Sequence, residues 1–270
     1  MELSLTVGKK RYAVDTARPI DISIPVRFDG TGVGAFGAPP PHREPYAKGS
    51  FIGDVTKGGS CNCDMLTFSP HLSGTHTECI GHIVSPAPAV CDKLKDAFIP
   101  ATVMTVTPST RGSDLYIPKR RPDDLLITKD VIFRALLGCN ADFLEGLVIR
   151  TLPNDPEKLT QNYGATCPPF FSLEAMNYLV SYGVEHLVVD IPSIDRLDDE
   201  GKLSNHHLFW NVEPGSRKET PKSFSSRTIT ELAYIPDTVN DGLYLLNLQV
   251  APLASDAAPS RPLLYPVTSL

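Results

Sequence analysis

Three histidines and a glutamate that lie close together in one segment could carry chemistry. His71, His76, Glu78 and His82 all fall in SPHLSGTHTECIGH, which follows a candidate strand. Residues two apart on an extended strand point to the same face, so His76 and Glu78 would converge. A converging imidazole and carboxylate suit zinc, manganese or iron. We expect a metal or acid–base site here, whereas a lone histidine would more simply be a core or surface residue.

A second group of candidate ligands lies later in the chain. His206 and His207 are adjacent, and on a strand they would point to opposite faces, so at most one would meet the first cluster. Glu231 is the lone carboxylate in an apolar, strand-like stretch, where an unpaired charge would be costly. Its partner could be a metal ion, or the guanidinium of Arg227 or Arg261.

Other chemistries have weaker support. The chain has no Gly-x-Ser-x-Gly elbow, no phosphate loop with its lysine, and no dinucleotide fingerprint that opens a helix. Apart from Cys61-x-Cys63, the six cysteines are scattered and do not match a structural zinc site. Most are expected to be small buried hydrophobes. A cysteine nucleophile at Cys61 or Cys63 is a distant third interpretation.

The elements that must position these residues are short strands joined by proline-rich loops, with a few helices. Thr128 and Ser172 can cap helices over residues 129–137 and 173–182, which Gly138 and Gly183 would end. The candidate strands are 21–26, 63–69, 101–106, 146–150, 186–191 and 244–250. An apolar run after the second helix predicts a strand buried on both faces and hence a mixed α/β fold. Long loops are expected at 29–50 and 211–226.

Composition bounds the class of protein. The 270 residues fit one domain, 1–270, and 41% hydrophobic with 21% charged residues excludes a disordered chain. A net charge of −6 does not indicate binding to nucleic acid or to an anionic membrane. We expect no membrane span, no secretory signal, and reduced thiols in the cytoplasm.

Gly74-Thr-His76-x-Glu78-x-x-x-His82 resembles a known signature. In the cyclase-like family of metal-dependent hydrolases, which includes bacterial kynurenine formamidase and isatin hydrolase, the pattern is Gly-Thr-His-x-Asp-x-Pro-x-His. Other stretches resemble that family in the same order, so the resemblance spans nearly the whole chain: 21–23, 147–151, 183–195, 206–207, 231 and 252–262.

The resemblance implies a compact α/β fold of the swivelling β/β/α type, with a β-barrel-like core and a few flanking helices. It implies one or two ions per chain, Zn²⁺ or Mn²⁺. His76, Glu78, His206 and Glu231 match metal ligands, with His206 preferred over His207, and His82 matches the acid–base histidine. Relatives commonly form homodimers or homotetramers, which we expect here as well.

The chain departs from the family pattern at three places. Glu78 stands where the family has aspartate, and Gly81 stands near the position of a proline. The family's first ligand position is occupied by Leu72, with His71 one residue earlier. A single-residue bulge after His71 would restore this histidine as a ligand. These changes indicate a divergent subgroup.

The resemblance implies a metal-dependent hydrolase of C–N amide bonds, similar to arylformamidase. Its small-molecule substrate would be N-formylkynurenine, as in tryptophan catabolism, or a related aryl formamide or cyclic amide. Phe36 could form an aromatic wall for it, and Asp190 and Asp195 could orient ligand histidines. The alternative is a metal-binding or catalytically degenerate scaffold of the same fold.

Overall fold

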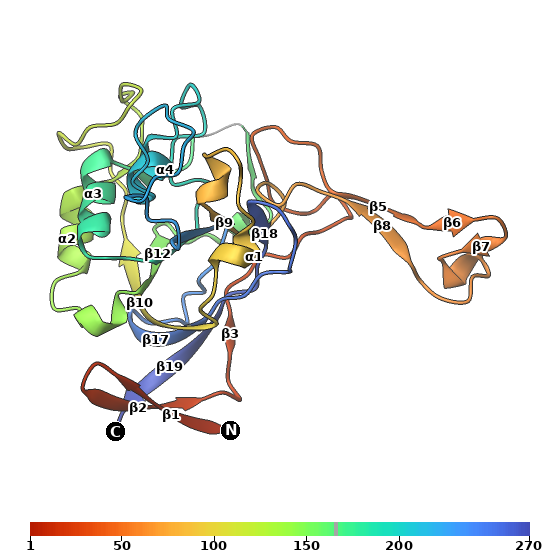
Figure 1. The fold of residues 1–270 in the computed structure, drawn as a ribbon, viewed down its shortest axis with the longest axis horizontal. Coiled ribbons are helices and arrows are strands. Elements are labelled where there is room, and N and C mark those ends of the chain that lie inside the picture. The colour runs from red at the N-terminus through yellow and green to blue at the C-terminus, as the bar shows by residue number, and fades with distance from the viewer. Residues whose placement is uncertain (165–166) are drawn as a thin grey trace.

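The computed structural model describes residues 1–164 and 167–270. Within these residues one large mixed sheet of eleven strands forms the centre of the molecule (Figure 1). Its middle is four parallel strands, β10 (Phe98–Val106), β12 (Gly146–Thr151), β15 (His186–Val189) and β16 (Thr228–Glu231). The antiparallel strands β9 (His76–Cys79) and β18 (Ala257–Pro259) extend it beyond β16.

On the other side of β10 the sheet continues with antiparallel strands that include both chain termini. These are β17 (Gly242–Asn247), β19 (Leu263–Ser269), β3 (Ile20–Asp21), β1 (Glu2–Val7) and β2 (Lys10–Asp15). The mixed α/β class is confirmed. The described strands run in order from β1 to β18 without those two pairing, so the expected barrel-like core is an open sheet.

The helices α2 (Lys129–Ala135), α3 (Leu173–Ser181) and α4 (Ser204–Phe209) cover one face of the central strands (Figure 1). The short helix α1 (Val90–Lys93) packs instead beside β9 and β18, where Val90 contacts Cys79 and Ala258. Thr128 and Ser172 cap α2 and α3 as predicted, through bonds from Val131 N (3.4 Å) and Ala175 N (3.0 Å). None of the helices in the described part of the chain is long and apolar enough to cross a bilayer.

The parallel strands are buried on both faces, as the apolar run predicted. Leu187 and Val189 join the core under the helices, whereas Val188 joins a second core on the opposite face. The two cores hold the carboxyl end of β16 in place, next to β9. This is the edge of the sheet at which Glu231 ends its strand.

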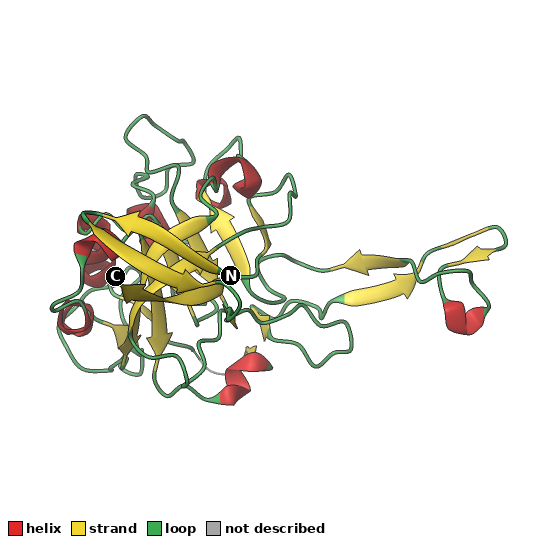
Figure 2. Cartoon of the chain, turned by 90° about the horizontal axis from the view of Figure 1, so that it is seen from below, coloured by secondary structure: helices red, strands yellow, loops and turns green. Residues whose placement is uncertain are grey.

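A narrow arm projects from the body in both views (Figures 1 and 2). Its stem pairs β5 (His42–Pro45) with β8 (Asp64–Thr67), and its tip pairs β6 (Ala47–Lys48) with β7 (Phe51–Ile52). The expected long loop at 29–50 was therefore wrong in part, and the molecule is less compact than expected. The candidate strand 63–69 corresponds to β8, but its partner β5 lies in the stretch expected to be a loop. The sequence did not reveal β5 because its residues are mostly exposed and lack apolar alternation.

The remaining elements are short. β4 (Gly34–Ala35) pairs with β13 (Asn162–Tyr163), and β11 (Leu126–Ile127) pairs with β14 (Phe170–Phe171). The predicted strand over 21–26 is reduced to β3, while the loop at 211–226 is confirmed. Single 3₁₀ turns occur at Val55–Lys57, Ile80–His82, Ala141–Phe143 and Pro156–Leu159.

Candidate metal centre

Strand geometry brings three of the predicted residues together. His76 and Glu78 lie two apart on β9 and share a face. The antiparallel register with β16 places Glu231 directly opposite His76. His76 Nε2 lies 3.6 Å from Glu231 Oε2. Glu231 is held by the backbone N–H of Ile194, which donates to Oε1 at 2.8 Å, so neither Arg227 nor Arg261 is its partner.

His206 reaches the same point from a helix. The expectation that the His206–His207 pair lies on a strand was wrong, because the pair belongs to α4. Neighbouring side chains on a helix diverge by about 100°, so only one faces the cluster. His206 Nε2 lies 3.0 Å from Glu78 Oε1, whereas His207 Nδ1 donates to the carbonyl of Val212 at 3.2 Å.

His71, and not Leu72, joins the cluster from the preceding turn. His71 Nδ1 lies 3.1 Å from Glu78 Oε2, and its ring centroid is 5.4 Å from that of His76. Leu72 packs instead against the small core around Ile24 and Val33. The turn therefore presents the histidine one position earlier than the family pattern does.

His82 follows β9 at the end of the 3₁₀ turn Ile80–His82. Its Nδ1 lies 3.8 Å from Glu78 Oε2 and 3.3 Å from Asp256 Oδ2. A side chain at Gly81 would collide with the carbonyl of Pro88, because a Cβ there would lie 2.4 Å from that oxygen. This close approach explains why glycine stands in the turn that aims His82.

The cluster fits a metal ion because the buried Nε2 of His76 faces the Glu231 carboxylate at 3.6 Å without forming a hydrogen bond. His76 Nδ1 donates to the carbonyl of Gly74 at 3.1 Å, so Nε2 of the neutral ring carries a lone pair. This Nε2 is buried and has no hydrogen-bond partner among the described residues. Donor atoms in a tetrahedral zinc site lie about 3.3–3.6 Å apart, which is close to the separations seen here.

Charge pairing inside the cluster shifts the pKa values of its members. Burial alone would raise the pKa of Glu78, but the charges of His82 and His206 hold it well below its usual value. Burial opposes charge on His206 too, yet Glu78 and Asp195 raise its pKa well above normal. Partial burial opposes charge on His71, but its hydrogen bonds to the carboxylates of Asp256 and Glu78 raise its pKa to about 10. Without an ion, His71 and His206 are therefore expected to be protonated at neutral pH.

Metal binding is therefore expected to release protons. A raised imidazole pKa means that the ring is protonated below that pH, so an ion must displace the proton and its apparent affinity falls as the pH falls. With His71 at about 10, the affinity should still rise with pH above neutrality. Zinc titration calorimetry in two buffers of different ionisation enthalpy measures this release. Identical heats in both buffers would contradict it.

Asp195 orients His206 as predicted. Its Oδ2 accepts from His206 Nδ1 at 2.6 Å, and its two oxygens also accept the N–H groups of Asn205 and His206 at the start of α4. Tyr116 donates to Oδ1 at 2.7 Å. Asp190 does not share this role, because it binds Lys158 Nζ at 2.8 Å and Thr151 instead. The expectation that Asp190 also orients a ligand histidine was wrong.

Replacing Asp195 with asparagine should lower metal affinity by about 10- to 100-fold, because outer carboxylates fix the ring and its tautomer. Competition with a chromogenic chelator measures the affinity. Asp198→Asn is the matched control, since Asp198 is exposed and pairs with Arg121. Equal affinities for the two variants would show that Asp195 does not support the site.

A cavity of about 310 Å³ opens onto the cluster. Five of the predicted site residues line it, and Phe36 lies at its wall with about half of its surface exposed. The other lining residues are Ser69, Leu72, Pro192, Ser193 and Leu203. Cys61 and Cys63 lie instead near the tip of the arm, which leaves the cysteine-nucleophile interpretation without geometric support.

Sequence reasoning missed Asp256. Its carboxylate contacts His71 and His82 from the loop before β18, far from both along the chain. The available signal is that Asp256 falls within 252–262, a stretch that resembles the family. A local motif could not reveal it, because only the pairing of β18 with β9 brings it near.

The model of the family described as "Putative cyclase" matches residues 15–196. The chain belongs to this cyclase family. The kynurenine formamidase of Bacillus cytotoxicus is 25% identical to it over 213 residues, which is 78% of this chain and 83% of that protein. The family resemblance is thus confirmed, and the low identity fits a divergent member.

Solved structures of the cyclase type share the fold. A protein of Bacillus stearothermophilus described as a predicted metal-dependent hydrolase superimposes with a TM-score of 0.59 at 20% identity, covering 92% of this chain and 98% of that one. Isatin hydrolase A of Labrenzia aggregata, bound to benzyl benzoate, gives 0.61 at 15% identity, covering 92% and 93%. Family and relatives together support an enzyme of the hydrolase and cyclase class.

Proposed function

We propose that this cyclase-family protein is a metal-dependent hydrolase of C–N amide bonds, with an aryl formamide or a cyclic aryl amide as substrate. The observation that carries the proposal is the buried His76 Nε2, whose lone pair faces the Glu231 carboxylate beside Glu78 and His206. This arrangement suits a cation, and it forms the floor of a cavity. Kynurenine formamidase and isatin hydrolase, the relatives by sequence and by fold, are enzymes named for such substrates.

His76, Glu78, His206 and Glu231 would hold one ion, because Glu231 lies 3.6 Å from His76 Nε2 and 3.9 Å from His206 Nε2. His71 with Glu78 would support a second ion. Nitrogen and carboxylate donors without thiolate suit Zn²⁺ and Mn²⁺. A bound ion of this kind lowers the pKa of water to about 7 and polarises a carbonyl oxygen. His82 stands at the side of the cluster and lines the cavity, where its ring can pass a proton to the leaving nitrogen.

The cavity walls support a small aromatic substrate. Phe36, Leu72, Pro192 and Leu203 are apolar, and Ser69 and Ser193 add hydroxyl groups that can orient a polar substituent. At about 310 Å³ the cavity lies at the small end of ligand sites, which run from about 300 to 1,000 Å³. A single ring with a short amide fits this space better than a peptide does.

The test is hydrolysis by the zinc- or manganese-loaded protein of N-formylkynurenine, formanilide and isatin, with an aliphatic formamide as the control substrate. We expect turnover of at least one aryl amide, loss of activity with a chelator, and recovery on adding the ion back. Retention of the ion with no turnover of any of them would favour the alternative, a metal-binding scaffold that has lost catalysis. N-formylkynurenine turnover would place the protein in tryptophan breakdown, and its free cysteines suit the cytoplasm.

We also propose that the protein is a homodimer joined through the arm. A two-stranded ribbon is marginal in water on its own, and here it leaves Tyr46, Met65 and Leu66 exposed. Its three basic and three acidic residues balance, although the chain carries −6, so two arms do not repel each other. A twofold pair of identical arms would bury these side chains.

Replacing residues 46–63 with Asn-Gly tests the dimer, because Pro45 and Asp64 are paired and a two-residue turn can join them. Light scattering should give two copies for the full chain and one copy for the shortened chain. A full chain that is monomeric at micromolar concentration, or a shortened chain that is still dimeric, would overturn this proposal.

A further inference from the structure

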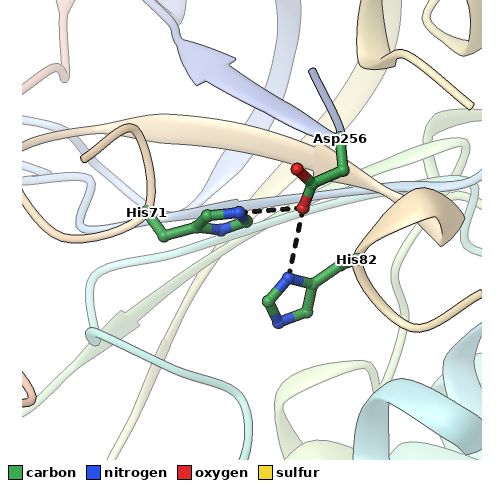
Figure 3. Close-up of side chains that lie close together, drawn as sticks. All are labelled: His71, His82 and Asp256. Carbon is green, nitrogen blue, oxygen red and sulfur yellow. Dashed lines mark hydrogen bonds and ion pairs between the residues drawn. The ribbon is translucent and has the colours of Figure 1, made fainter. Parts of the chain in front are cut away.

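We propose that Asp256 is a positioning residue that fixes the tautomers of both His71 and His82; this rests on the proposed function. One carboxylate oxygen serves both rings (Figure 3). Asp256 Oδ2 lies 2.9 Å from His71 Nε2 and 3.3 Å from His82 Nδ1. Asp256 is no part of the signature around His76, and it lies 174 residues from His82 along the chain.

The backbone holds Asp256 firmly against the segment that it serves. Its carbonyl accepts the N–H of Cys79 at 3.0 Å, next to Glu78 on β9. The carbonyl of Ser255 accepts the N–H of Val90 at 2.8 Å. The Ser255 hydroxyl donates to Asp256 Oδ1 at 3.2 Å, which leaves Oδ2 to the two rings. The carboxylate is therefore aimed by contacts with the same strand and turn that carry His82.

For His82 the consequence is a defined acid–base nitrogen. A carboxylate oxygen only accepts, so Nδ1 carries the proton of the neutral ring. Nε2 lies on the side of the ring away from Asp256 (Figure 3). Because His82 lines the cavity, Nε2 is the nitrogen left to exchange a proton there. A histidine that exchanges a proton with a substrate needs its second nitrogen held in this way.

The same oxygen contacts Nδ1 in His82 but Nε2 in His71. Nε2 donates to Asp256, and Nδ1 is left facing Glu78 Oε2 at 3.1 Å, among the candidate ligands. Histidines that bind a metal through one ring nitrogen commonly donate the N–H of the other nitrogen to a carboxylate in this way. One aspartate thus orients two rings with different duties, through opposite nitrogens. Its geometry couples the proton-transfer histidine to the metal cluster.

The test compares Asp256→Asn and Asp256→Glu with Asp92→Asn, an exposed aspartate on α1, as the matched control. The tautomer of His82 is measured by long-range ¹H–¹⁵N correlation in the zinc-loaded protein, with the resonance assigned through His82→Gln. Metal content, kcat and KM are measured on the same samples. The asparagine amide can turn its NH₂ towards His82 and favour the wrong tautomer.

We expect the wild type to hold the Nδ1–H tautomer at His82 and Asp256→Asn to lose it. The kcat of Asp256→Asn should fall by about 10²- to 10⁴-fold, with KM little changed and with the ion at His76, Glu78, His206 and Glu231 retained. Asp256→Glu should recover part of this loss. An Nε2–H tautomer in the wild type, or an unchanged kcat in Asp256→Asn, would overturn the proposal. Loss of the ion at His76, Glu78, His206 and Glu231 in Asp256→Asn would also overturn the proposal, since Asp256 would then be a metal ligand. The tautomer of His82 is measurable without turnover. A failure of the proposed amide hydrolysis can therefore be distinguished from a failure of the proposed role of Asp256.

Discussion

Replacing His82 with alanine is expected to lower kcat by about 10²- to 10⁴-fold, the usual contribution of a positioned acid–base group. His82 lines the cavity, about a quarter of its side chain is exposed, and its nearest approach to Glu78 is 3.8 Å. The four proposed ligands, His76, Glu78, His206 and Glu231, remain in place in this variant, so the ion bound there should stay. The combination of full metal content with lost turnover separates proton transfer from metal binding.

Steady-state kinetics and elemental analysis of the same preparation measure this prediction. His42→Ala is the control, because His42 is exposed on the stem of the arm. We expect the control to keep wild-type kcat. Full activity in His82→Ala would end its assignment as the acid–base group, and loss of the ion would make His82 a ligand.

Removing the carboxylate of Glu78 is expected to have the largest effect on the site as a whole. Glu78 is fully buried and lies within 3.1 Å of two histidines, His71 and His206. Removing one partner of a buried charge pair costs about 3–5 kcal/mol, because the other partner stays buried and unpaired. In Glu78→Ala the metal-free protein should therefore unfold more easily, and it should no longer retain an ion.

Glu78→Asp is the matched control, since the family signature has aspartate at this position. It should keep an ion, with an altered affinity because the shorter side chain moves the carboxylate. Denaturant unfolding of the metal-free proteins and elemental analysis of the loaded ones measure both effects. Wild-type metal content in Glu78→Ala would show that Glu78 is not a metal ligand.

Local patterns were sufficient where geometry is local. The two-residue spacing of His76 and Glu78 predicts a shared face, and β9 has that form. Thr128 and Ser172 cap their helices as predicted, because capping depends on a few neighbouring residues. The apolar run over residues 184–191, which contains β15, identified a strand buried on both faces.

Contacts between segments far apart along the chain could not be predicted from the sequence. Asp256 meets His82 only because β18 pairs with β9, and no periodicity encodes that contact. The His206–His207 pair reads equally well as strand or helix, and the carboxylate of Asp195 at the start of α4 decides in favour of the helix. The stem of the arm needs β5 and β8 to find each other across its tip.

Elemental mass spectrometry of the purified protein, with wild type beside His76→Ala, is the decisive experiment for the metal centre. We expect one to two zinc or manganese ions per chain in the wild type and their loss in the variant, because His76 Nε2 has no other partner in the described structure. A wild-type protein that holds no ion and cannot be loaded with zinc or manganese would contradict the proposed metal centre.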